Sequence, residues 1–90
     1  MPKYVIEREI PRVGSLSSGD MRGAAQKSCA VLREMGPRIQ WLESFVTADK
    51  LYCVYIADDE KSVREHATAS GFPASRVSEV RAIVGPTTAE

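Results

Sequence analysis

Histidine is scarce in this chain of 90 residues, because His66 is the only one. One imidazole is a thin basis for a tight transition-metal site within a single chain. An excess of basic charge is also lacking. Twelve Lys and Arg residues balance twelve Asp and Glu residues and are scattered along the chain, so nucleic acid is not expected as a partner. No segment approaches the ~20 apolar residues of a membrane span.

Cysteine is equally sparse, and the standard catalytic motifs are missing. Cys29 and Cys53 lie far apart and follow no CxxC spacing, so they are expected to be reduced, packed thiols. The first residues lack the apolar run of a signal peptide, which favours a cytoplasmic location. No Gly-rich phosphate loop, GxSxG elbow or HExxH motif occurs. A serine or cysteine hydrolase is therefore not expected.

What is present is an ordinary globular composition, 43% hydrophobic and 27% charged. Ninety residues favour one domain, residues 1–90. A chain this short buries a modest share of its surface, so a partner subunit would add stability.

The order of predicted elements follows from hydrophobic periodicity. Residues 3–9 alternate and are rich in β-formers, which predicts a strand. An apolar stripe predicts an amphipathic helix over residues 17–36, capped by Ser17 or Ser18 and ended by Gly36; the stripe consists of Met21, Ala25, Cys29, Leu32 and Met35.

The rest of the chain is predicted to form three strands and one helix. Residues 38–46 and 50–57 predict two strands of an antiparallel hairpin. A helix is predicted over residues 59–71, opened by Asp58 or Asp59 and ended by Gly71, and a fourth strand over 75–84. The order βαββαβ predicts a ferredoxin-like α+β fold, with two helices on one face of a four-stranded antiparallel sheet.

Both faces of this predicted sheet are apolar. Strict alternation puts Val5, Leu42, Val46, Val54, Ile56, Val80 and Val84 on one face, and Tyr4, Ile6, Ile39, Trp41, Phe45, Leu51, Cys53, Tyr55, Val77 and Ile83 on the other. Two helices can cover only one face, and the aromatic-rich face is too hydrophobic to leave in water. Two sheets stacked face to face would solve this, so we expect a homodimer, a dimeric α+β barrel.

Several polar residues interrupt these faces and are candidates for chemistry. Glu7 and Glu9 project beside Val5, whereas Arg8, Glu43, Glu79 and Arg81 share the aromatic-rich face. Interface ion pairs, such as Arg8 with Glu79, or a cleft that uses the carboxylates would satisfy them. His66 shares a helix side with positions 59, 63 and 70. It is either a partly exposed helical residue or a metal ligand or proton-transfer group.

The segments YVIEREIP, LYCVYIADDEKSVREHA and VSEV resemble a family of small bacterial proteins that includes nickel-binding, nickel-responsive members. This resemblance runs over nearly the whole chain and implies a dimeric ferredoxin-like protein with a divalent metal, nickel being the candidate. Many members carry an Asp-Arg-His run in the first strand and two histidines four residues apart in the second helix.

The resemblance also implies which residues would bind the metal. Glu7 stands at the position of the family's aspartate, Glu9 replaces a histidine, and His66 matches the first helical histidine while Ser70 replaces the second. The implied metal ligands are therefore Glu7, Glu9 and His66. This set has two imidazoles fewer than the family pattern and is harder in character.

Two other functions stay open from the sequence. One is a small dimeric-barrel enzyme, an isomerase or monooxygenase, with an apolar pocket of about 300 Å³ or more beside a titratable group. Trp41, Phe45 and Tyr55 could line that pocket around a small apolar ligand. The other is a small-molecule-binding or purely structural dimer, which needs no catalytic group.

Overall fold

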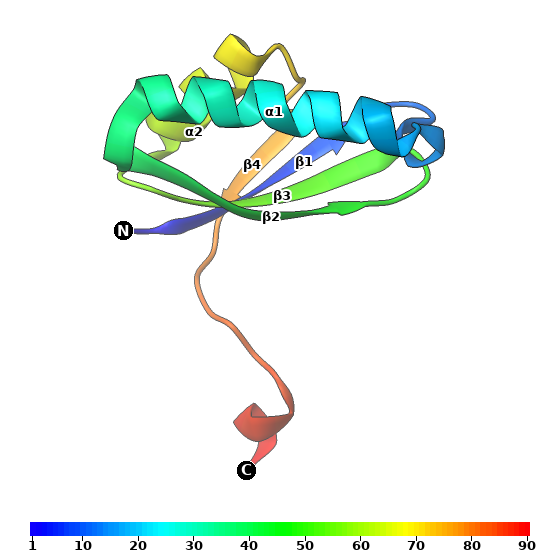
Figure 1. The fold of residues 1–90 in the computed structure, drawn as a ribbon. Helices are drawn as coiled ribbons and strands as arrows, with labels where there is room; N and C mark the ends of the chain where they lie inside the picture. Colours follow the sequence, from blue (N-terminus) through cyan, green and yellow to red (C-terminus); the bar gives the residue numbers. More distant parts are fainter.

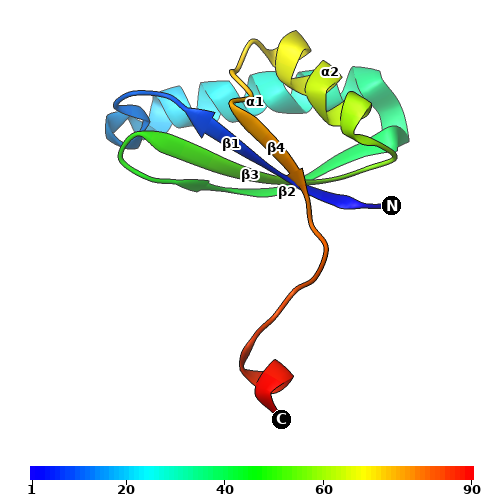
Figure 2. The same ribbon diagram turned by 180° about the vertical axis from the view of Figure 1, so that it is seen from behind.

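The chain folds into four strands and two α-helices. The computed structural model describes residues 1–90 and begins with strand β1 (Lys3–Glu9), followed by helix α1 (Ser18–Met35). Strands β2 (Ile39–Val46) and β3 (Lys50–Ala57) form a hairpin, and helix α2 (Glu60–Ser70) leads to strand β4 (Arg76–Glu79). Both helices lie on one side of the sheet (Figures 1 and 2).

The four strands form one antiparallel sheet in the order β2-β3-β1-β4. This order and the helix placement confirm the predicted ferredoxin-like α+β fold. Neither helix combines the length and apolar character needed to cross a membrane.

Local capping explains where both helices begin and end. The Ser17 side chain accepts a hydrogen bond from the Asp20 amide at the start of α1, and Asp59 accepts one from Ser62 at the start of α2. Gly36 and Gly71 end the helices with φ of +77°, a conformation that favours glycine. These caps were all predicted from the sequence.

The helices cover the aromatic-rich face of the sheet, which corrects the expectation that this face awaits a second sheet. In β1 the side chains of Tyr4, Ile6 and Arg8 are buried, whereas Val5 and Glu7 are half-buried and Glu9 is exposed. The buried core cluster combines strand and helix residues, namely Tyr4, Ile6, Ile39, Cys53, Tyr55, Ala57 and Val63. The face without helices, here called the open face, is the one that carries Val5 and Val54.

A bulge in β2 changes which residues point to which face. Trp41 pairs with Tyr55 and Glu43 pairs with Val54, so Leu42 is an extra residue without a partner on β3. Beyond the bulge Phe45 pairs with Tyr52 on the open face, and Phe45 is 55% exposed. The predicted positions of Phe45 and Glu43 on the aromatic-rich face are therefore wrong, because strict alternation fails at a bulge.

The last strand is shorter than predicted. β4 ends at Glu79, opposite Tyr4 near the start of β1, and only one further bond joins it to the sheet, from the Val80 amide to the Lys3 carbonyl. The strand cannot continue because β1 begins at Lys3 and offers no further partner. Residues 81–90, here called the arm, run away from the body on the side opposite the helices (Figures 1 and 2).

Candidate functional site

His66 lies on the inner side of α2, where it faces the sheet. Its neighbours along the buried side are Ser62, Val63, Ala67 and Ser70. The side chain is completely buried, with 0% of its surface exposed. The expected shared helix side with Val63 and Ser70 is confirmed, whereas the expectation of a partly exposed histidine is wrong.

One ring nitrogen of His66 is engaged and the other is not. Nε2 lies 3.1 Å from the Ser28 hydroxyl of α1 and 3.2 Å from the Tyr55 hydroxyl of β3. The Tyr55 and His66 rings pack at an angle of 59° with centroids 5.1 Å apart. Nδ1 is buried and has no hydrogen-bond partner. Three elements, α1, α2 and β3, therefore converge on one imidazole.

Arg8 completes this buried polar cluster from β1. Its Nη1 donates to the Pro73 carbonyl at 2.8 Å, and Nη2 donates to the Tyr55 hydroxyl at 3.4 Å. The guanidinium lies 5.8 Å from the centre of the Phe72 ring, within cation–π range. Only 1% of Arg8 is exposed, and it takes part in no ion pair. The expected pair of Arg8 with Glu79 is wrong, because Arg8 points into the core.

Burial and this positive charge set the protonation states of the cluster. Desolvation, followed by repulsion from Arg8, lowers the pKa of His66 from 6.5 to about 4. Burial raises the pKa of the Tyr55 hydroxyl above its ordinary value, although Arg8 acts in the opposite direction. At neutral pH the site therefore holds a neutral imidazole, a neutral phenol and one fixed guanidinium.

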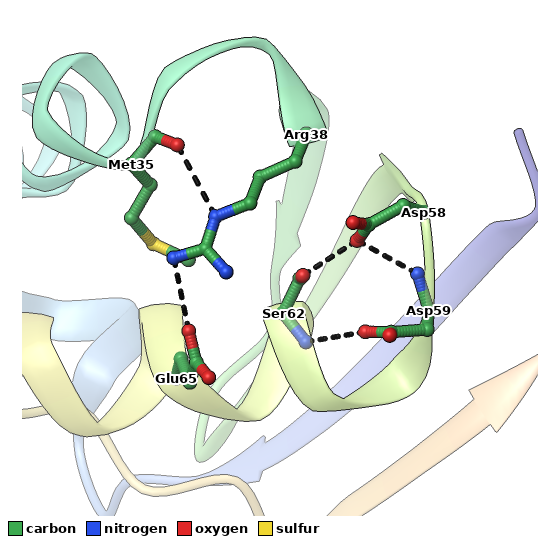
Figure 3. A network of polar contacts seen from close by, with 6 residues as sticks. All are labelled: Met35, Arg38, Asp58, Asp59, Ser62 and Glu65. Atoms are coloured by element: carbon green, nitrogen blue, oxygen red, sulfur yellow. Dashed lines mark hydrogen bonds and ion pairs between the residues drawn. The ribbon is translucent and has the colours of Figure 1, made fainter.

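Polar contacts anchor the start of α2 and join it to the segment after α1 (Figure 3). Arg38, just after α1, donates to the Met35 carbonyl at 3.2 Å and pairs with Glu65 of α2 at 3.0 Å. The Asp58 carboxylate accepts from the Ser62 hydroxyl, and these bonds lower the pKa of Asp58. The network therefore fixes the first two turns of α2, the helix that carries His66.

The carboxylates of Glu7 and Glu9 lie on the open face of the sheet, away from His66. Each is close to the Lys50 ammonium, with Nζ–O distances of 3.9 Å for Glu7 and 4.0 Å for Glu9. The Glu7 side chain is 31% exposed and that of Glu9 is 66% exposed. Both side chains are thus available to a ligand that approaches the open face.

The structure does not bring the three expected metal ligands together within one chain. Glu7 and Glu9 are on one side of the sheet, and His66 is sealed on the other beside a guanidinium that repels cations. No group of three or more His, Cys, Asp or Glu side chains is placed to hold a metal ion. Nδ1 of His66 is one free nitrogen, whereas nickel needs several ligands. These residues therefore do not fit nickel as a single intrachain site.

Sequence reasoning missed one member of the buried cluster. Ser28 sits three residues after Ala25 and four before Leu32 in the α1 stripe, so its spacing could have placed it toward the sheet. Cys53 is buried and Cys29 is half-buried, and both are free thiols as expected.

Two surface hollows lie away from the buried cluster. One is lined by Arg12, Gly14, Met21 and the β2–β3 turn, and the other lies on the outer side of α2 around Glu60 and Arg64. Neither contains Trp41, Tyr55 or His66. The structure therefore offers no support in these hollows for an enzyme pocket beside a titratable group.

The fold defines a ferredoxin-like α+β protein whose open face is not covered by any of its own helices. The model of the family described as "Nickel responsive protein SCO4226-like" matches residues 4–80. The chain therefore belongs to the family of SCO4226-like nickel-responsive proteins, as the resemblance implied.

One solved structure supports the same fold. The crystal structure of SCO4226 from Streptomyces coelicolor A3(2) is similar with a TM-score of 0.76 and 14% sequence identity, over 91% of this chain and 99% of that one. No curated protein matches this chain.

Proposed function

We propose that this protein is a homodimer that binds a divalent metal ion, with nickel as the candidate. The observation that carries this proposal is the match of the nickel-responsive family model to residues 4–80. The Glu7 and Glu9 carboxylates would be the protein's ligands. His66, although it was an expected ligand, has no contact with the ion in this proposal because it is enclosed on the helix side.

The position of the two carboxylates supports a site shared by two chains. β1 is an inner strand of the sheet, so Glu7 lies near the middle of an interface that the open face would form. Two chains stacked through this face would bring several carboxylates into one region. Carboxylates buried without partners are costly, and Lys50 or a divalent cation would offset that cost. A site of oxygen ligands alone is hard in character and predicts weaker nickel binding than an imidazole site.

Isothermal titration of nickel into metal-stripped protein tests this proposal. We expect Glu7→Gln/Glu9→Gln to weaken nickel binding by about tenfold or more, since both charged ligands are lost while the shape is kept. Glu34→Gln is the control, because Glu34 is an exposed carboxylate on α1, on the side of the molecule away from the open face; its affinity should stay within about twofold.

A second variant separates the two expected ligand groups. His66→Gln should leave nickel affinity within about threefold of the unmodified protein. Loss of nickel binding in a folded His66→Gln variant, with binding retained in Glu7→Gln/Glu9→Gln, would move the site to the buried cluster. No heat with nickel, zinc or copper from a folded protein would refute metal binding.

A further inference from the structure

The arm is an unusual part of this molecule because its apolar residues touch almost nothing. Ile83 is 77% exposed and Val84 is 76% exposed, more than any other large hydrophobic residue in the chain. Residues 81–85 form no helix or strand, and Pro86–Ala89 form a short 3-10 helix. The family model matches residues 4–80, and the arm lies beyond this match. Adjacent β-branched residues held in water lose the burial free energy that they would gain against another surface.

The direction of the arm indicates what covers these residues. It leaves the sheet on the side opposite the helices, which is the side where a second sheet would stack (Figures 1 and 2). Stacked sheets lie about 10 Å apart, and four extended residues span roughly 13 Å. Residues 81–84 are therefore long enough to cross from one sheet to the level of the next.

The edges of the sheet indicate where the arm would land. β2 and β4 are the two edge strands, and β4 carries the arm. A two-fold axis that runs between two stacked sheets, along their strands, places the β4 edge of each chain over the β2 edge of the other. β2 carries two exposed apolar residues at and beyond its bulge, Leu42 (45%) and Phe45 (55%), and Phe45 lies on the open face.

Charge adds to this match. Arg81, at the start of the arm, has an 87% exposed side chain and only a distant contact with Glu79 at 3.9 Å. Glu43 is exposed beside Leu42 in β2 and takes part in no ion pair. An arm that reaches β2 of a second copy would bring these opposite charges together.

We propose that the arms of two copies of this chain are exchanged, so that Ile83 and Val84 of each copy pack against the β2 edge of the other around Leu42. This inference rests on the homodimer of the proposed function but is independent of metal. It assigns the arm the role of a clasp that holds two stacked sheets together.

The dissociation constant of the dimer, measured by sedimentation in metal-free buffer, tests the clasp. Ile83→Asp/Val84→Asp should raise the constant by about 100-fold, because two buried apolar side chains are lost. Thr87→Asp/Ala89→Asp adds the same charge further along the arm and should change it by less than about threefold. The arm makes no contact with the core, so both variants are expected to fold normally.

Disulfide trapping tests where the arm lies. In a Cys29→Ser background, Ile83→Cys/Leu42→Cys should give a covalent dimer on mild oxidation. Ile83→Cys/Lys61→Cys is the control, since Lys61 is exposed on α2, and it should give much less.

The outcomes separate the clasp from the dimer itself. A dimer that is unaffected by Ile83→Asp/Val84→Asp and gives no 83–42 cross-link overturns the clasp and leaves the homodimer standing. A chain that stays monomeric at all concentrations overturns both, whatever the nickel titration shows.

Discussion

His66 is enclosed by α1, α2 and the sheet, and this enclosure decides how it responds to protons. Its neutral form is favoured in the folded state because the charged form would be desolvated beside Arg8. A histidine of this kind is a source of acid sensitivity and not a switch at neutral pH. His66 therefore takes part in hydrogen bonds within the core as a neutral imidazole at neutral pH.

The first residue-scale prediction concerns stability against pH. The pKa of His66 is about 4 in the folded protein and 6.5 in the unfolded chain. The unfolded state therefore binds a proton first as the pH falls. The contribution of His66 to the free energy of unfolding should be fully present above about pH 6.5. It should decline as the pH falls toward 4, by about 1–3 kcal/mol in total. Urea unfolding at several pH values measures this, and proton NMR follows the single imidazole directly.

Two variants identify the origin of this effect. His66→Gln should remove the decline between pH 6.5 and 4, and Arg8→Met should raise the pKa of His66 because the neighbouring positive charge is gone. If the imidazole of the unmodified protein titrates near 6.5 while the protein stays folded, the enclosure described for His66 is incorrect.

At the scale of elements, two glycines differ in how closely other backbone atoms approach them. A Cβ at Gly14 would lie 2.6 Å from the Thr47 carbonyl oxygen, because the turn after β1 packs directly on the β2–β3 hairpin. A Cβ at Gly23, in the middle of α1, would meet no atom within 4 Å. The same substitution should therefore have opposite effects at the two sites.

We expect Gly14→Ala to lower the free energy of unfolding by about 1–3 kcal/mol, since backbone atoms must move apart. Gly23→Ala should raise it by about 0.5–1 kcal/mol, because alanine favours the helix. Urea denaturation of the two variants beside the unmodified protein gives both values. Equal effects of the two substitutions would contradict the packing of this turn on the hairpin.

The elements differ in how far the sequence predicts them. Caps such as Ser17, Asp59 and Gly71 are predictable because a cap depends on residues within one turn. The bulge at Leu42 is not, because it depends on pairing with β3. The end of β4 depends on where β1 begins, more than seventy residues earlier in the chain, so periodicity alone extends the strand to residue 84.

In the candidate site too, the sequence predicts local features but not those that depend on tertiary packing. Alternation predicts that Arg8 and Tyr55 share a sheet face, but it cannot tell that the helices cover that face. The nickel ligands implied by family resemblance, Glu7, Glu9 and His66, combine both sides of the sheet. Their sequence positions match the family, but tertiary packing decides on which side of the sheet each side chain lies.

At the scale of the whole molecule, the proposed homodimer can be tested at the open face. Val54 lies on this face opposite Val5 and takes no part in the core beneath the helices. Val54→Asp should keep the fold, as judged by circular dichroism, and should raise the dimer dissociation constant by about 100-fold or more. Light scattering over a concentration series measures the mass.

The control for this prediction places the same charge elsewhere. Thr68→Asp lies at an exposed position of α2, on the far side of the molecule from the open face, and should not change the mass. A Val54→Asp protein that dimerises as well as the control would exclude the open face as the interface.

The single unpaired residue in β2 has a consequence for comparing relatives. Leu42 reverses the odd–even rule within one strand, so Trp41 and Ser44 point to the same face although three positions separate them. A relative without the bulge would need an alignment gap inside this strand and not in the loops around it. Without that gap, every position from Glu43 to Val46 would be matched to a residue of the opposite face, and an inward-facing side chain would be mistaken for an outward-facing one.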